Sequence, residues 1–531
     1  MTETVAIRLN KRRLIENLRF AFPNRYSVVA ELLQNARRAG ASSLVLTYDA
    51  GAKRLVVRDD GCGIADFQTL LTLGESGWSE AVQRAEHPFG LGFLQSLYAA
   101  GRCTVESGGQ RVAFDTRAAL AGATVGVERG TDARGTTVTL EEVELPRLDR
   151  ELVRMTRGFP IPVHFNGVVL RRPHAPDALP YVETSIGRVY LAGVEDGAVT
   201  RETAVYLQGL MIEGPAMLGT PCNVVHLDSA AFQARLPDRD RLMEQDAQLK
   251  RVESVLKALW RDRLIAAKRV ATPEVFAARC FRAATLWGHL DLFNDVPVLP
   301  EGVLRRVVGY PCREGLEGAR FLVPFRRPLA RSEVESGRLR LACLSPFDDE
   351  SAVRWMYARE RAYLVFEAWA VAPEHWAFAH VRRLDEEPVS VEAINPGPRT
   401  SLAGRRIEAT VLACEAIELR VGEDRVVIRD EAVYRPGDNT ILVPENESSG
   451  QAVRQVSNYV DRKGDWSETD ERSDTAALEE AIALLRSTNP AGAFLRLIAE
   501  ARPERYPSLR GRRFTVEVGE TPHQHRVAAE T

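Results

Sequence analysis

Residues 59–64 read DDGCGI and directly follow a strand-like run, RLVVR, at residues 54–58. The two glycines allow a sharp turn at the end of that strand. Earlier in the chain, residues 31–35 read ELLQN within a helical pattern. That spacing places Glu31 and Asn35 one turn apart on the same helix face. A strand-end acid and a helix-borne pair of polar side chains therefore come close together in the sequence.

A third segment, FGLGF at residues 89–93, opens an apolar stretch that predicts a helix over 93–100. A glycine-rich turn at a helix N-terminus presents backbone N–H groups and the positive end of the helix dipole to an anion. The three segments thus supply a carboxylate, an amide, a strand-end acid and an anion cradle. This combination predicts a nucleotide site.

The order and spacing of these segments resemble the motifs of the GHKL superfamily of ATPases. That superfamily includes gyrase, the ninety-kilodalton heat-shock chaperone, histidine kinases and MutL. A fourth segment, RGTTV at residues 134–138, begins a strand-like run as the family's last nucleotide-binding motif does. A lone Gly-x-Gly is a weak motif, but four motifs in family order are specific. The resemblance implies ATP binding with Mg²⁺.

The resemblance also implies a role for each motif residue. Glu31 matches the catalytic glutamate that polarises the attacking water, and Asn35 matches the magnesium ligand. Asp59 matches the acid that accepts the exocyclic amine of adenine, which favours ATP over GTP because guanine has a carbonyl there. Gly61 and Gly63 would let the adenine ring approach the backbone.

Three further positions follow from the same resemblance. Gly90 and Gly92 would cradle the phosphates, and Thr136 would support the adenine. Between the motifs, residues 66–88 are expected to form a lid hinged at glycines 74 and 77. The chain departs from the family at His87, where a glycine is usual, and at Glu75, where the chaperone branch has a lysine.

One element lies outside these motifs. Residues 236–242 read LPDRDRL and precede a long helical pattern. The segment resembles the chaperone middle-domain loop whose arginine reaches the γ-phosphate, so Arg239 is the expected catalytic arginine and Arg241 the next candidate. An arginine is always charged and binds phosphate oxygens through a fork of N–H groups. The alternative is a solvated, charged helix start.

The bulk composition limits the class of protein. A length of 531 residues predicts about three or four domains. The apolar fraction of 45% and the net charge of -3 fit a soluble protein without an overall nucleic-acid signature. None of the seven cysteines forms a Cys-x-x-Cys pair, which argues against a zinc ribbon. Residues 1–10 lack the apolar core of a signal peptide, so we expect a cytoplasmic location without membrane contact.

We expect an α/β fold in four parts. An N-terminal Bergerat-fold α/β sandwich at 1–150, implied by the resemblance, precedes a second α/β domain of the transducer or middle type at 151–270. A mixed α+β region follows, with a domain of unknown role at 272–400 and a β-rich segment, polar linker and C-terminal helices at 401–531. The expected helices are 11–21, 27–39 and 245–268, the linker is 445–475, and the expected strands are 43–48, 55–58, 110–115, 136–141, 163–170, 187–191 and 205–210.

The expected function is a slow, Mg-ATP-dependent conformational switch of the chaperone-like class. It would act on a protein client through residues 272–531 and form a homodimer through its N-terminal domains. A nucleic-acid clamp of the MORC or MutL kind, in DNA maintenance or defence, is the less favoured alternative. A third alternative is an inactive nucleotide-binding scaffold, against which the intact Glu31 argues.

Overall fold

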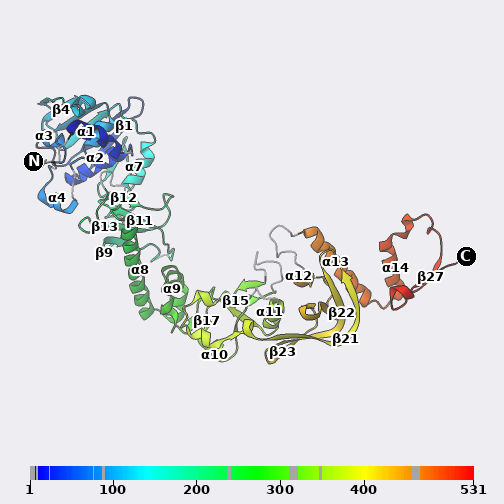
Figure 1. Cartoon of the computed structure of the whole chain (residues 1–531). Coiled ribbons are helices and arrows are strands. Elements are labelled where there is room, and N and C mark those ends of the chain that lie inside the picture. Colours follow the sequence, from blue (N-terminus) through cyan, green and yellow to red (C-terminus); the bar gives the residue numbers. More distant parts are fainter. Residues whose placement is uncertain are drawn as a thin grey trace, which may run out of the picture. The chain divides into compact units, whose positions relative to one another are not determined.

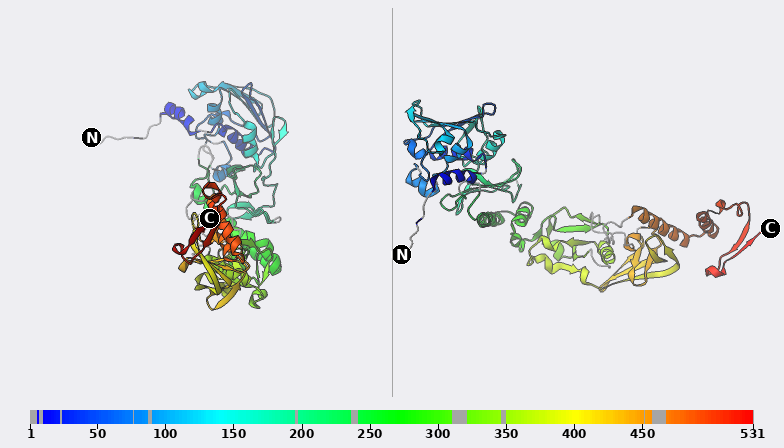
Figure 2. Two further views of the ribbon diagram at one scale, coloured as in Figure 1. Left: turned by 90° about the vertical axis from the view of Figure 1, so that its right-hand side faces the viewer. Right: turned by 45° about the horizontal axis from the view of Figure 1, so that its top comes forward.

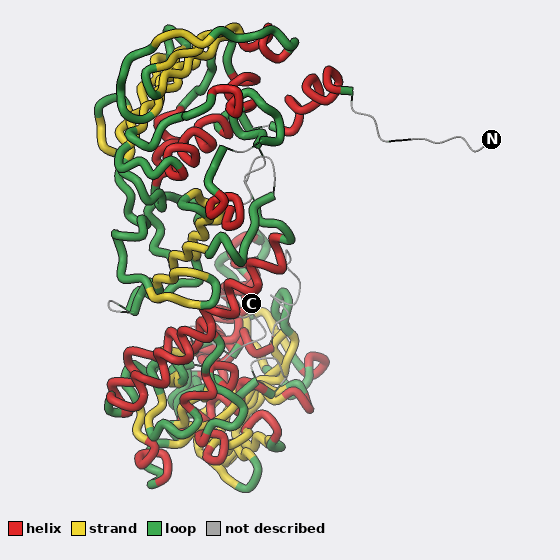
Figure 3. Tube along the Cα trace, turned by 90° about the vertical axis from the view of Figure 1, so that its left-hand side faces the viewer, coloured by secondary structure: helices red, strands yellow, loops and turns green. Residues whose placement is uncertain are grey.

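The computed structural model describes residues 6, 10–22, 24–75, 77–86, 90–194, 197–235, 241–309, 321–345, 350–450, 452–456 and 467–530. Its described residues form a mixed α/β protein with several mixed sheets and about 14 helices. Figures 1 and 3 show these strands and helices along the chain. The chain divides into two compact units, Met1–Ala271 with Arg279–His289, and Thr272–Ala278 with Leu290–Thr531. No helix in the described ranges is long and apolar enough to cross a membrane.

The N-terminal part of the first unit is built on an eight-stranded sheet in the order β5-β4-β3-β6-β2-β1-β7-β8. Neighbouring strands are antiparallel except β1 and β7, which are parallel. In chain order the strands are β1 (Leu44–Asp49), β2 (Arg54–Asp59), β3 (Arg102–Ser107), β4 (Gln110–Asp115), β5 (Val127–Arg129), β6 (Thr136–Glu141), β7 (Val163–Phe165) and β8 (Val168–Val169).

One face of this sheet forms the core of the domain. In β1, Leu44 and Leu46 are fully buried while Val45 is exposed, because successive side chains point to opposite faces. Helix α2 (Ser27–Arg38) packs Leu32 and Leu33 into the same core cluster. The other helices of this part, which is coloured blue to cyan in Figure 2, are α1 (Lys11–Leu18), α3 (Phe67–Leu70), α4 (Glu80–Glu86), α5 (Leu94–Ala99), α6 (Thr116–Leu120) and α7 (Leu148–Thr156).

The first sheet extends past the expected domain boundary at residue 150. Residues 163–170, expected as one strand of the second domain, form the hairpin β7–β8, which turns at Asn166 and Gly167. Strand β7 pairs in parallel with β1, and Phe159 and Val163 join the core of the first domain. The N-terminal sheet domain therefore ends near Val169.

The remainder of the first unit contains a five-stranded sheet in the order β12-β11-β13-β10-β9. Its strands are β9 (Val182–Thr184), β10 (Gly187–Tyr190), β11 (Thr203–Leu207), β12 (Leu210–Glu213) and β13 (Asn223–Leu227). The expected strand 205–210 crosses a turn at Gln208 and Gly209, where φ is positive at both residues. The long helix α8 (Gln245–Val270) buries Val252, Leu256 and Trp260 at four-residue spacing, and α9 (Pro273–Trp287) follows it.

The second unit holds four more sheets and five more helices among its described residues. Strand β22 pairs with β21, β23 and β25, and its hairpin to β23 turns at Gly422 and Glu423. The strands are β14 (Val298–Leu299), β15 (Leu304–Val307), β16 (Leu322–Pro324), β17 (Leu329–Ala330), β18 (Arg340–Cys343), β19 (Tyr363–Phe366), β20 (Val381–Arg383), β21 (Val389–Ala403), β22 (Glu408–Val421), β23 (Asp424–Ile428), β24 (Val433–Arg435), β25 (Thr440–Pro444), β26 (Phe514–Glu517) and β27 (Arg526–Ala529). The helices are α10 (Arg331–Glu335), α11 (Ser351–Glu360), α12 (Val453–Val456), α13 (Glu468–Leu485) and α14 (Pro490–Ala501).

The end of the expected polar linker at 445–475 is helical. Helix α13 begins at Glu468, and the side chain of Ser467 accepts a hydrogen bond from the amide of Asp470 at 3.2 Å. Three acidic residues in the first turn complement the helix dipole. The charged composition thus marks a capped helix start at 467–475 and not a linker.

Candidate functional site

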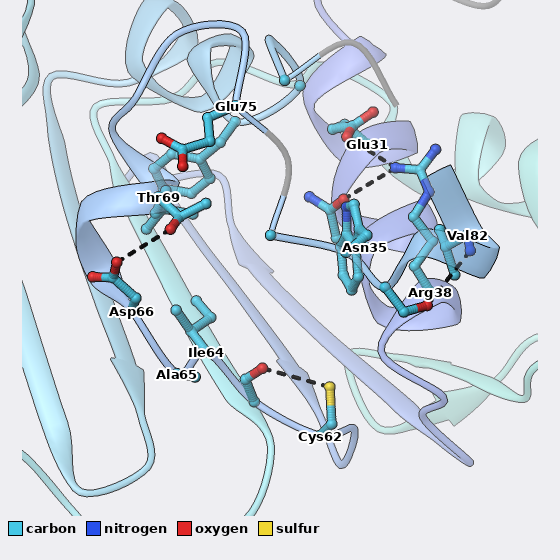
Figure 4. Close-up of a pocket in the computed structure, with 18 of the residues that line it drawn as sticks. Glu31, Asn35, Arg38, Cys62, Ile64, Ala65, Asp66, Thr69, Glu75 and Val82 are labelled. Atoms are coloured by element: carbon cyan, nitrogen blue, oxygen red, sulfur yellow. Dashed lines mark hydrogen bonds and ion pairs between the residues drawn. The ribbon is translucent and has the colours of Figure 1, made fainter. Parts of the chain in front are cut away.

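One face of helix α2 carries three polar side chains that point toward a cavity (Figure 4). Glu31, Asn35 and Arg38 are spaced four and three residues apart, so they form one stripe along the helix. The Nη1 group of Arg38 lies 3.4 Å from Oε1 of Glu31 and 3.3 Å from Oδ1 of Asn35. The carboxylate and the amide expected from the sequence therefore share one guanidinium.

Helix α4 supplies the strongest partner of that guanidinium. Oε2 of Glu86 accepts from Nε of Arg38 at 2.9 Å and from Nη2 of Arg37 at 2.6 Å. Burial raises the pKa of Glu86, but hydrogen bonds and charge from the two arginines outweigh it, so the net pKa is lowered. The acid therefore stays ionised and ties α4 to the end of α2.

The turn after β2 is attached to the end of α2 and to the neighbouring strand. The amide of Cys62 donates to the carbonyl of Ala39 at 2.9 Å. Oγ of Ser107 accepts from the amide of Ile64 at 2.8 Å and donates to the carbonyl of Gly135 at 2.8 Å. Gly63 has φ +78, and a Cβ there would lie 2.7 Å from Oγ of Ser107, so only glycine fits this approach.

The two acids of this turn differ in environment. Asp59 accepts a hydrogen bond from the amide of Gly61 at 2.9 Å, and burial raises its pKa despite the lowering effect of the Gly61 and Thr136 amides. Asp60 accepts from the hydroxyl and amide of Ser42, which lowers its pKa to about 2. Asp60 thus holds the turn in place, whereas Asp59 is the acid whose pKa is raised by burial.

The glycine loop before α5 packs on the other motifs. Gly90 has φ +67, and a Cβ there would lie 2.5 Å from the carbonyl oxygen of Glu75. Gly92 lies directly on Glu31, whose carboxylate a Cβ at position 92 would overlap. The amides of Leu94, Gln95 and Ser96 donate to the carbonyls of residues 91–93. The amides of the first three residues of α5 are therefore engaged within the turn itself.

These elements enclose a cavity of about 620 Å³. Its size falls in the usual range for small-molecule sites. Figure 4 shows Glu31, Asn35 and Arg38 on one wall and Asp66, Thr69 and Glu75 on the opposite wall. The lining residues are Glu31, Asn35, Arg38, Cys62, Gly63, Ile64, Ala65, Asp66, Thr69, Leu70, Glu75, Gly77, Trp78, Ser79, Val82, Gly90, Leu91, Gly92 and Phe93.

The expected site residues fall into three groups. Glu31, Asn35, Gly63, Gly90 and Gly92 line the cavity. Three others, Asp59, Gly61 and Thr136, lie at the adjoining ends of β2 and β6 but are not among the lining residues. The catalytic candidate Arg239 and the loop residues His87 and Phe89 lie outside the described residues.

The segment around Arg239 is described only at its base. The amide of Arg235 donates to the carbonyl of Arg241 at 2.7 Å, and Ala234 forms an antiparallel bridge with Leu242. Arg241 therefore lies directly before the bridge residue Leu242, and helix α8 begins only at Gln245. The role of Arg239 stays a prediction.

Sequence reasoning missed three residues of this region. Arg38 lies one turn after Asn35 on the same helix face, and extending the ELLQN pattern by three residues would have found it. Ser107 ends a strand, β3, that was not predicted. Gln34 is buried and donates from Nε2 to the carbonyl of Gln208 at 2.9 Å, so α2 contacts the turn between β11 and β12.

A magnesium ion held by Asn35 does not fit this arrangement. The oxygen that would bind the ion accepts a hydrogen bond from Arg38, whose positive charge opposes a second cation. In the described part of the chain no group of three or more His, Cys, Asp or Glu side chains could hold a metal ion. In the described structure the positive charge beside Glu31 and Asn35 is the guanidinium of Arg38.

A scan of protein-family models gives no match to this chain, and a search of curated proteins gives none either.

Proposed function

We propose that the first unit binds and hydrolyses ATP and that it is a GHKL-type nucleotide-binding domain of Bergerat fold. The observation that carries this proposal is the convergence of separate motif segments on one cavity. Glu31 and Asn35 from α2, Gly63 from the turn after β2, and Gly90 and Gly92 from the loop before α5 all line it. They come from segments distant in the chain, which chance apolar packing does not explain.

The position of Glu31 supports a role in hydrolysis. Its side chain is 12% exposed and lies against the glycine loop that would hold the phosphates. A carboxylate beside a bound terminal phosphate can orient the attacking water, which is the main task of the protein in phosphoryl transfer. Glu31 is therefore the proposed water-orienting residue.

We assign recognition of the base to the end of strand β2, which adjoins the turn that lines the cavity. Asp59 is half-buried at the end of β2, where its carboxylate would accept the exocyclic amine of adenine. A buried carboxylate that must meet a donor discriminates strongly against a ligand that offers a carbonyl instead. We therefore expect ATP and ADP to bind and GTP to bind poorly.

The contact between Gln34 and Gln208 supports a switch function. Gln34 lies between Glu31 and Asn35 on α2, so a shift of that helix on binding nucleotide moves a residue bonded to the second sheet. A two-state element biased by a ligand is what a conformational switch requires. The chaperone-like action on a protein client is part of this proposal. Affinity capture with Glu31→Ala, expected to hold the ATP-bound form, tests for that client.

Thermal unfolding with ATP, ADP and GTP tests the proposed function. A nucleotide at about 100 times its dissociation constant stabilises the native state by about 2.7 kcal/mol. Asp59→Asn should abolish the stabilisation, whereas the matched variant Asp60→Asn should keep it because Asp60 bonds only to the Ser42 region. Glu31→Ala should bind ATP without hydrolysing it. If neither ATP nor ADP stabilises the protein, the proposal is refuted.

A further inference from the structure

The guanidinium of Arg38 is almost completely enclosed. Its side chain is 1% exposed, and its Nε donates to Oε2 of Glu86 at 2.9 Å. The contacts of Nη1 with Glu31 and Asn35 are longer, at 3.4 and 3.3 Å. The group is thus anchored at one end and held weakly at the other.

The remaining nitrogen of that guanidinium, Nη2, is buried and has no hydrogen-bond partner among the described residues, although Arg38 lines the cavity. A buried donor without an acceptor is destabilising, and more so when it is charged. Such a group in a cavity indicates a ligand that brings the missing acceptor. Phosphate oxygens suit it, because the planar fork of arginine binds them with two parallel hydrogen bonds.

The charges of the residues that line the cavity give a second, independent reason to assign phosphate binding to Arg38. Three carboxylates, those of Glu31, Asp66 and Glu75, line the cavity. Among the described lining residues Arg38 is the only cation. A phosphorylated ligand that enters this cavity therefore needs either Arg38 or a metal ion to offset the negative charge.

We propose that Arg38 is the phosphate-binding cation of this cavity and occupies the position otherwise expected for a magnesium ion. The identity of the ligand as a nucleotide polyphosphate rests on the proposed function. Arg38 would exchange its weak contacts with Glu31 and Asn35 for phosphate oxygens while Glu86 holds it in place. Once Arg38 has moved to the phosphate, the carboxylate of Glu31 is free to orient the attacking water. Nucleotide binding by the intact protein accordingly does not depend on magnesium.

Calorimetric titration of the full chain tests this inference with ATP and with tripolyphosphate, each in excess EDTA and in excess Mg²⁺. The wild-type protein should bind ATP with the same affinity, within about threefold, in both conditions. Arg38→Met should lose at least tenfold in affinity in EDTA, which corresponds to about 1.4 kcal/mol. Mg²⁺ should restore part of that loss, because the freed oxygens of Glu31 and Asn35 can then face the metal.

Arg37→Met is the matched control. Arg37 also pairs with Glu86, at 2.6 Å, but it is not among the lining residues, so its removal should leave the affinity unchanged. Arg38→Met leaves Glu86 paired with Arg37, and circular dichroism checks that the variant folds. Arg38→Lys keeps the charge but not the fork, so it should bind ATP in EDTA more tightly than Arg38→Met and less tightly than the wild-type protein, which separates loss of the phosphate contact from loss of fold.

The outcomes separate the inference from the proposed function. Wild-type ATP binding that disappears in EDTA, with Arg38→Met unaffected, overturns the inference and leaves the ATPase proposal standing. Arg38-dependent binding of tripolyphosphate without preference for adenine supports the inference and refutes the nucleotide assignment. If neither ATP nor tripolyphosphate binds in either condition, both are refuted.

Discussion

Substitution by alanine should destabilise the protein at Gly90 but not at Gly92, the two glycines of the proposed phosphate loop. At Gly90, φ is +67, and a left-handed backbone costs an L-residue about 1–2 kcal/mol. The new Cβ would also lie 2.5–2.6 Å from backbone atoms of Glu75, which cannot rotate away. We expect Gly90→Ala to destabilise the first unit by about 2 kcal/mol or more.

Gly92→Ala should leave stability nearly unchanged. Gly92 is not among the residues with positive φ, and the three atoms nearest to its new Cβ all belong to the side chain of Glu31. That carboxylate ends a flexible side chain, and turning it costs about 0.5–1.5 kcal/mol. Alanine recovers about 0.4–1 kcal/mol by restricting the unfolded chain. The net change should stay within about 1 kcal/mol, while the carboxylate is displaced from the loop.

Activity should therefore separate from stability in Gly92→Ala. If Glu31 orients the water, its displacement should slow ATP turnover by at least about 100-fold. Hydrogen exchange at Gly74, whose amide donates to the carbonyl of Gly90 at 3.1 Å, should increase in Gly90→Ala and not in Gly92→Ala. Adding Gly92→Ala to Glu31→Gln should change turnover no further, because both act through one carboxylate. Normal turnover by Gly92→Ala would show that the observed position of Glu31 has no catalytic role.

Three further substitutions test the contacts around the cavity. Glu86→Gln should cost about 3 kcal/mol at pH 7 by denaturation, because Arg38 stays buried without its main charge partner. In the wild-type protein the pKa of Glu86 is lowered from its ordinary value of 4.5, so its ionised form stabilises the fold at pH values above 4.5. This contribution should be lost as the pH falls through the folded-state pKa. Ser107→Ala should cost about 1–3 kcal/mol in the same assay, since it leaves the amide and the carbonyl that the hydroxyl joins unpaired. Gln34→Met should speed hydrogen exchange near Gln208 without changing exchange in residues 66–86. An equal increase in both places would contradict a direct link between α2 and the turn at Gln208.

The local elements of the first domain were largely predictable from the sequence. Strands β4 and β6 follow the period of two between apolar and polar residues, and their observed bounds equal the expected 110–115 and 136–141. Errors arose at turns. The Asn-Gly pair at 166–167 is a strong hairpin turn and splits an apolar run that was taken as one strand. The parallel pairing of β7 with β1 joins residues far apart in the chain, so no local pattern indicates it.

The candidate site shows where a motif stops being informative. Glu31, Asn35 and Arg38 share a helix face through local spacing alone, and the sequence therefore indicates their proximity. Whether Arg38 turns toward that pair or toward solvent depends on Glu86, which lies 48 residues away on α4. Without that carboxylate, a guanidinium enclosed to this degree would be too costly to bury. If Arg38 binds phosphate as proposed, the contact that positions it comes from Glu86 on helix α4, which lies outside every motif of the site.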